Sequence, residues 1–133
     1  MSILPIPPDP KPLAWVGSAL DDLRDLPDEV RSDIGFALFD AQCGGKSGLA
    51  KPLKGFGGAG VLEIVEAFDG EAYRAVYTVR LAGRIYVLHV FQKKSKRGIE
   101  TPKSVIALIR QRLRRAEEMH LDWQRENAKE DRT

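Results

Sequence analysis

The sequence has little of what metal sites and disulfide frameworks need, and it lacks any long apolar run. Its 133 residues contain one cysteine, Cys43, and two histidines, His89 and His120. A single cysteine excludes an internal disulfide framework, and the sequence shows no ligand spacing typical of a metal site. No stretch approaches the roughly 18 apolar residues of a membrane span, and no apolar run long enough for a signal peptide precedes Ser18. We therefore expect one soluble, cytoplasmic domain without metal or cofactor.

Acidic residues are scarce in one part of the chain. Residues 74–115 hold twelve Lys/Arg and a single acid, Glu100, whereas the other residues hold nine Lys/Arg and eighteen acids. The net charge of +2 hides this segregation. Cations held next to a regular strand favour the binding of phosphate groups.

The first half of the chain predicts an arm, a strand and two helices. Five of the eight prolines lie within residues 2–12, which predicts an extended, Pro-rich N-terminal arm over residues 1–12. Residues 13–16 predict a short strand. Two helices joined at Pro27 follow, and apolar residues recur at every third or fourth position of the second one: Val30, Ile34, Leu38 and Ala41. The glycine-rich residues 44–60 predict a loop, and they lack the upstream glycine of a phosphate-binding P-loop.

The second half predicts a sheet. Residues 61–68, 73–81 and 84–91 read as strands separated by glycine-containing turns, and together they predict an antiparallel meander. The last strand is apolar on both faces, which predicts an interior position. Strict alternation along it places His89 on the same face as Val87.

A final helix is predicted to begin at Thr101-Pro102. Its buried stripe comprises Val105, Ile109, Leu113 and Ala116, and its exposed side is predicted to carry Arg110, Arg112, Arg114 and Arg115. Residues 126–133 are polar and predict a tail. The chain is thus expected to form one α+β domain over residues 13–125.

Five short segments stand in a fixed order along residues 13–115: WVGSA at 15–19, LPDEVR at 26–31, KPLKG at 51–55, YRAVY at 73–77 and VLHVFQKKS at 87–95. This ordered set resembles type II toxins of the RelE/ParE superfamily, in their phage-derived, HigB-like branch. The resemblance implies a RelE-like fold with a short N-terminal strand, a two-helix hairpin, an antiparallel meander and a C-terminal helix. It also implies a metal-independent, ribosome-dependent mRNA endonuclease, neutralised by a cognate antitoxin of the small helix-turn-helix type that covers the basic face.

The resemblance assigns roles to individual residues. Arg74 matches the arginine that contacts the scissile phosphate, and Lys94 matches a cation near the leaving group, with Lys93 beside it. His89 is a further catalytic candidate. Cations expected to bind RNA are Lys51, Lys54, Arg80, Lys96 and Arg97. Arg74 and Lys94 are predicted to be exposed, so that replacing either by alanine leaves folding intact.

Two departures from the family pattern affect the predicted chemistry. Glu63 and Val65 stand where RelE carries two catalytic lysines, and residues 95–115 contain no aromatic residue where many relatives have a tyrosine. The expected replacement for the missing groups is His89 or Glu63.

Structural and functional alternatives stay open at this point. Arg74 can instead pair with Glu63 or Glu66 across the sheet, Lys93 and Lys94 can belong to an ordinary solvated loop, and His89 can be a core histidine. For the whole chain, the alternatives are a ParE-like inhibitor of DNA gyrase and a non-enzymatic phage or nucleic-acid-binding protein.

Overall fold

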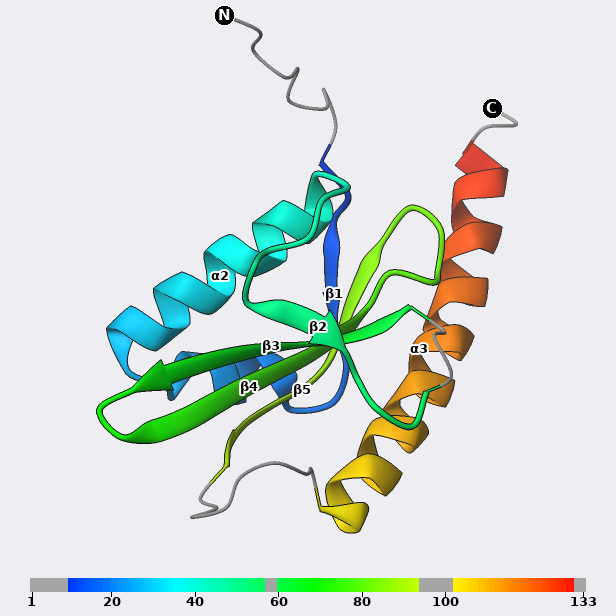
Figure 1. Ribbon diagram of the computed structural model, residues 1–133. Helices are drawn as coiled ribbons and strands as arrows, with labels where there is room; N and C mark the ends of the chain where they lie inside the picture. The colour runs from blue at the N-terminus through cyan, green and yellow to red at the C-terminus, as the bar shows by residue number, and fades with distance from the viewer. Residues whose placement is uncertain (1–9, 57–59, 94–101, 131–133) are drawn as a thin grey trace, which may run out of the picture.

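The computed structural model describes residues 10–56, 60–93 and 102–130, and Figure 1 shows how their helices and strands are arranged. In chain order the elements are β1 (Leu13–Trp15), α1 (Ala19–Arg24), α2 (Asp28–Gln42), β2 (Ala50–Pro52), β3 (Val61–Phe68), β4 (Glu71–Thr78), β5 (Ile85–Lys93) and α3 (Lys103–Glu130). The predicted α+β class and the predicted order of helices and meander strands are confirmed.

The strands form one sheet in the order β1-β5-β4-β3-β2. Strands β3, β4 and β5 make the predicted antiparallel meander, and β1 joins it in parallel beside β5. The sequence did not predict β2, which pairs with β3 at the other edge. Its three residues end at Pro52, and a proline on an edge strand limits further pairing.

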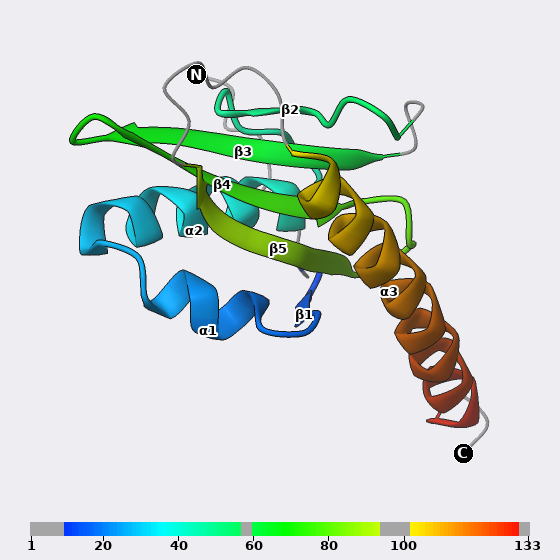
Figure 2. The same ribbon diagram turned by 90° about the horizontal axis from the view of Figure 1, so that it is seen from below.

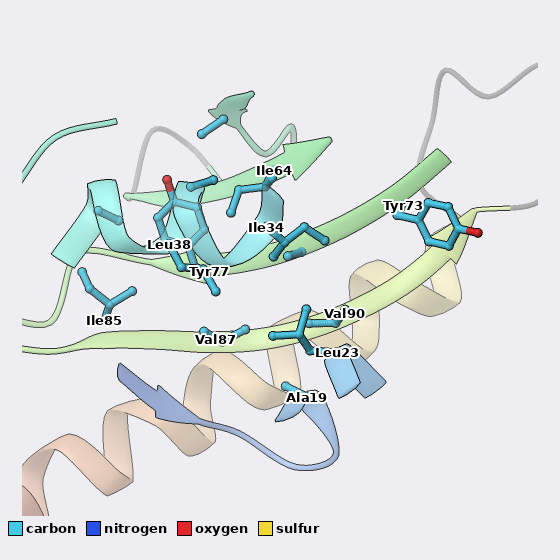
Figure 3. Close-up of a cluster of buried hydrophobic side chains, with 14 of the residues drawn as sticks. Ala19, Leu23, Ile34, Leu38, Ile64, Tyr73, Tyr77, Ile85, Val87 and Val90 are labelled. Carbon is cyan, nitrogen blue, oxygen red and sulfur yellow. The ribbon is translucent and has the colours of Figure 1, made fainter. Parts of the chain in front are cut away.

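Helices cover both faces of the sheet. Figure 2 shows α1 and α2 on one face and α3 crossing the other, which we call the α3 face. Two separate clusters of buried residues fill these layers. The cluster under α1 and α2 includes Ile34 and Leu38 of α2 packed with Ile64 and Tyr77 of the sheet (Figure 3). The predicted stripe of α2 is confirmed, because all four of its residues are buried.

The cluster on the α3 face joins α3 to the sheet. Ile109, Leu113 and Ala116 of α3 are buried there with Val76 and Leu88, and Val105 packs against the cluster. The predicted stripe of the last helix is thus confirmed on the side that it was expected to bury.

A β-bulge in β5 changes which face each side chain occupies. Val76 pairs with His89, but the next residue of β4, Tyr77, pairs with Val87, which leaves Leu88 as an extra residue. Val87 and Val90 therefore both lie in the α1–α2 cluster. The predicted alternation was wrong beyond Leu88, because a bulge shifts every later side chain to the other face. His89 consequently lies on the α3 face.

Helix α3 extends further than predicted: residues 126–130, expected in the polar tail, are helical. A cluster of aromatic and cationic side chains fixes its C-terminal half. The hydroxyl of Tyr86 lies 3.0 Å from Nδ1 of His120. The Arg84 guanidinium lies 5.1 Å from the centre of the Tyr86 ring and 5.2 Å from that of Trp123. These contacts stabilise the helix beyond its apolar stripe.

Two buried tyrosine hydroxyls differ in their partners and give a matched test of the fold. Tyr77 is fully buried, and its hydroxyl has no hydrogen-bond partner among the described residues. Burial, together with the nearby charge of Asp40, raises the pKa of Tyr77 to about 12. Tyr86 is equally buried, but its hydroxyl contacts both Arg84 and His120.

We predict that Tyr77→Phe leaves the free energy of unfolding unchanged or higher, because removing an unsatisfied hydroxyl costs nothing. Tyr86→Phe should lower it by about 1 kcal/mol or more, since His120 loses its partner. Urea denaturation of both variants measures the difference. If Tyr77→Phe lowers the free energy of unfolding by more than about 1 kcal/mol, the Tyr77 hydroxyl has a stabilising partner, and its description as unsatisfied is wrong.

Candidate functional site

The sheet brings several of the predicted site residues onto the α3 face. Adjacent strands pair Lys51 with Glu63, Glu63 with Val76, and Val76 with His89, so that one row crosses four strands. The next row pairs Val65 with Arg74 and Arg74 with Phe91. Lys93 pairs with Ala72 one row further on. Because alternate residues of a strand share a face, Lys51, Glu63, Arg74, His89 and Lys93 all belong to this face.

Arg74 forms a buried ion pair with Glu63. Its Nη1 donates a hydrogen bond of 2.8 Å to Oε2 of Glu63, and each side chain is only 6% exposed. Lys51 approaches the other carboxylate oxygen at 3.7 Å and is 60% exposed. The prediction that Arg74 is exposed was therefore wrong, whereas the alternative pairing with Glu63 is confirmed. Glu66 lies opposite Tyr73, on the other face of the sheet.

His89 is half-buried on the α3 face of the sheet, beside Arg112 of α3. Its ring stacks on Phe91 at 4.7 Å between centroids, and its Nδ1 lies 3.1 Å from Nη1 of Arg112. Burial lowers the pKa of His89, the Arg112 charge lowers it further, and Asp22 partly opposes both. The lowered pKa favours the neutral form of the ring. Arg112 was predicted on the exposed side of the last helix, but it points inward and is partly buried.

The remaining predicted cations differ in their burial, and some lie outside the part of the chain that the structure describes. Lys93 is the last residue of β5 and is buried, so it does not belong to a solvated loop. Lys94, Lys96 and Arg97 lie outside the described residues. Lys54 is exposed in the turn after β2.

Arg80 is exposed but lies beyond the end of β4. The sequence placed it together with Arg74 in the predicted strand 73–81. Arg80 lies six positions after Arg74, which corresponds to roughly 20 Å along an extended chain. The structure thus brings Arg74, His89, Lys51 and Lys93 to one face and leaves Arg80 away from them.

One contact at this face has no signal in the sequence. Arg110 of α3 donates a 2.7 Å hydrogen bond to the carbonyl oxygen of Gly55, and its guanidinium lies 4.6 Å from the centre of the Phe56 ring. This contact holds the turn that carries Lys54 against the N-terminal half of α3. A contact across 55 positions has no local sequence pattern that predicts it.

Acidic and basic residues are concentrated in different helical layers of the fold. The segment from Ala19 to Gln42, which contains α1 and α2, holds seven acids and two arginines, whereas residues 103–115 of α3 hold five cations and no acid. The two helical layers lie on opposite faces of the sheet (Figure 2). An anionic ligand is therefore directed toward the α3 face.

Among the described residues there is no group of three His, Cys, Asp or Glu side chains that could hold a metal ion. Within the same part of the chain, no helix is both long and apolar enough to cross a membrane.

Residues 21–114 match a family of proteins described as phage-derived protein Gp49-like. This range covers most of the chain, so the chain belongs to the phage-derived Gp49-like family, and the phage-derived resemblance seen in the sequence is confirmed. Among solved structures, it is similar to the toxin–antitoxin complex RelBE2 from Mycobacterium tuberculosis, with 20% identity and a TM-score of 0.45 over 63% of this chain and 99% of that one. None of the curated protein sequences matches the chain.

We predict that Arg74→Ala lowers the free energy of unfolding by about 3 kcal/mol, because it leaves the buried Glu63 carboxylate without its guanidinium. Arg24→Ala is the matched control. It removes an exposed arginine whose ion pair with Asp21 is 3.8 Å long, and it should change stability by less than about 0.5 kcal/mol. Chemical denaturation followed by circular dichroism measures both values. Equal, small effects would show that the Arg74–Glu63 pair contributes nothing to stability.

Proposed function

We propose that this protein is the toxin of a type II toxin–antitoxin pair and acts as a metal-independent, ribosome-dependent mRNA endonuclease. The observation that carries the proposal is the arrangement on the α3 face. There, one carboxylate, Glu63, is held by Arg74 and lies in the same cross-strand row as Lys51 and His89. Membership of a phage-derived family and the ordered toxin-like segments agree with it.

Metal-free RNA cleavage needs three kinds of group. A base accepts the proton of the 2′-hydroxyl, cations stabilise the charge of the pentavalent phosphate, and an acid protonates the leaving 5′-oxygen. The 2′-oxygen forms a bond to phosphorus while the bond to the 5′-oxygen breaks. The products are a 2′,3′-cyclic phosphate and a 5′-hydroxyl.

In the proposed mechanism Arg74 binds the scissile phosphate and Glu63 is the base. Both side chains are buried in the free protein, so the phosphate has to replace the Glu63 carboxylate on the Arg74 guanidinium. This exchange preserves the charge pairing of Arg74 and releases a carboxylate next to the 2′-hydroxyl. The ion pair thus keeps both groups in place until RNA arrives.

The leaving oxygen is proposed to receive its proton from Lys94, as the resemblance implies. Lys93 precedes it directly and lies on the α3 face beside the Arg74 row. A cation near this position also stabilises the charge that develops on the phosphate in the transition state. Lys51 and Lys54, both exposed, are proposed to bind the neighbouring RNA backbone, and Lys96 and Arg97 are proposed to extend this contact.

The proposed partner in the cell is a cognate antitoxin that covers the same face. An acidic surface on that antitoxin would complement the five cations in residues 103–115. The resulting hetero-oligomer would block access of RNA to Arg74.

The test is inducible expression in bacterial cells, with mapping of mRNA 5′ ends in the presence and absence of a translation inhibitor. We expect translation-dependent cuts for the unaltered protein. Glu63→Gln and Arg74→Lys keep side-chain size or charge, and each should reduce cutting by about 100-fold or more. Lys94→Ala should reduce it as well, because the leaving oxygen loses its acid. Circular dichroism of each purified variant shows whether it is folded.

Arg24→Ala removes one positive charge from the acidic layer and serves as the control with unchanged cutting. Full activity of folded Glu63→Gln would contradict its role as the base. DNA breaks with intact mRNA would instead support inhibition of DNA gyrase, and absence of toxicity would support a protein that only binds nucleic acid.

A further inference from the structure

Arg112 is a cation of α3 that the predicted RNA contacts leave without a role. Its guanidinium makes three hydrogen bonds to two other parts of the fold. Nη1 donates to the carbonyl oxygen of Leu88 at 3.0 Å and contacts Nδ1 of His89 at 3.1 Å. Nη2 donates to Oγ of Ser18 at 3.2 Å. Arg112 therefore connects α3 both to the bulge of β5 and to the start of α1.

The residues around Arg112 are suited to hold it there. The Ser18 hydroxyl donates a hydrogen bond of 2.7 Å to Oδ2 of Asp22, and its oxygen accepts the hydrogen bond from Arg112. Gly17 has a φ of +57°, and a Cβ atom at this position would lie 3.0 Å from the guanidinium carbon. Both the positive φ and the space taken by Arg112 therefore favour glycine at the centre of the WVGSA segment.

The chemistry of arginine fixes the direction of the bond to His89. A guanidinium carries only N–H donors and stays charged, so Nδ1 of His89 has to be the acceptor. In a neutral imidazole only one nitrogen accepts, and the proton therefore resides on Nε2. The two hydrogens of Nη1 suffice for Leu88 and His89 together.

We propose that Arg112 is a positioning residue that holds His89 as the neutral tautomer protonated on Nε2, so that His89 serves RNA cleavage as a hydrogen-bond donor and not as a base. The role in cleavage rests on the proposed function, whereas the tautomer is a property of the free protein.

Two features of the site agree with a donor role. Burial and the Arg112 charge lower the pKa of His89, with Asp22 opposing them, so the imidazolium form needed for a general acid is disfavoured. Nδ1 is occupied by Arg112 and Nε2 already carries a proton, which leaves no free lone pair to accept the proton of a 2′-hydroxyl. A neutral imidazole with a fixed N–H can instead stabilise negative charge on a phosphate oxygen.

The first part of the test is NMR of the RNA-free, full-length protein labelled with nitrogen-15 on histidine. We expect two-bond correlations that place the His89 proton on Nε2 at pH 7, and a His89 pKa below its ordinary value of about 6.5. In Arg112→Gln the pKa should move upward toward that value, whereas the matched control Arg115→Gln, on the exposed side of α3, should leave it unchanged. A proton on Nδ1 in the unaltered protein would overturn the proposal, and this result does not require any variant to fold.

The second part measures cleavage in the same 5′-end assay. His89→Ala should reduce cutting by about 100-fold, whereas His89→Gln, which keeps a side-chain N–H donor, should stay within about tenfold of the unaltered protein. Equal, complete loss in both folded variants would show that His89 acts by proton transfer and would overturn the donor role. If the unaltered protein cuts no RNA, the proposed function fails, while the NMR result still decides whether Arg112 sets the tautomer.

Discussion

The buried ion pair between Arg74 and Glu63 determines how the basic face of this protein can be used. Arg74 stands where the toxin resemblance places the phosphate-binding arginine, but in the free chain its guanidinium is paired with an internal carboxylate. An arginine in this state is not an open phosphate site. It becomes one only when a stronger or better-placed anion displaces Glu63. The same event would release the carboxylate that the proposed chemistry needs, so a single exchange links binding to catalysis.

The rest of the fold supports that pair from both sides. Strands β2, β3 and β4 bring Lys51, Glu63 and Arg74 together across the sheet, and the bulge at Leu88 turns His89 toward the same face. Helix α3 covers this face and contributes Arg112. The helices α1 and α2, which carry most of the acids, lie on the opposite face, although Asp22 of α1 is linked to Arg112 through Ser18. Cations are therefore concentrated in the first half of α3, and acids are concentrated in the helical layer on the other side of the sheet.

Periodicity in the sequence predicted the parts of the fold that depend on local burial. The stripes of α2 and α3 and the strands of the meander follow from residue patterns that repeat every few positions, whereas the parallel pairing of β1 with β5 was not predicted. Features set by distant contacts were not predicted. Strand β2 has only three residues, and the extension of α3 depends on His120 and Trp123 meeting Arg84. No local pattern indicates either one.

For the candidate site, the sequence named candidate residues but did not show how they are paired or buried. Arg74, His89 and Lys93 do share a face, but the sequence could not show that Glu63 neutralises Arg74 or that Arg112 points inward. Alternation along β5 assigned His89 to the wrong face, because one extra residue at Leu88 reverses the pattern. The pairing of charged residues on neighbouring strands depends on register, and register is fixed by the whole sheet.

The most direct measurement is a cryo-EM structure of the protein on a bacterial ribosome with an mRNA whose reactive 2′-hydroxyl is methylated to prevent cleavage. The account predicts that the Arg74 guanidinium contacts the scissile phosphate and that Glu63 has left it to lie beside the methylated oxygen. An mRNA bound elsewhere on the protein, with the Arg74–Glu63 pair intact, would contradict the account.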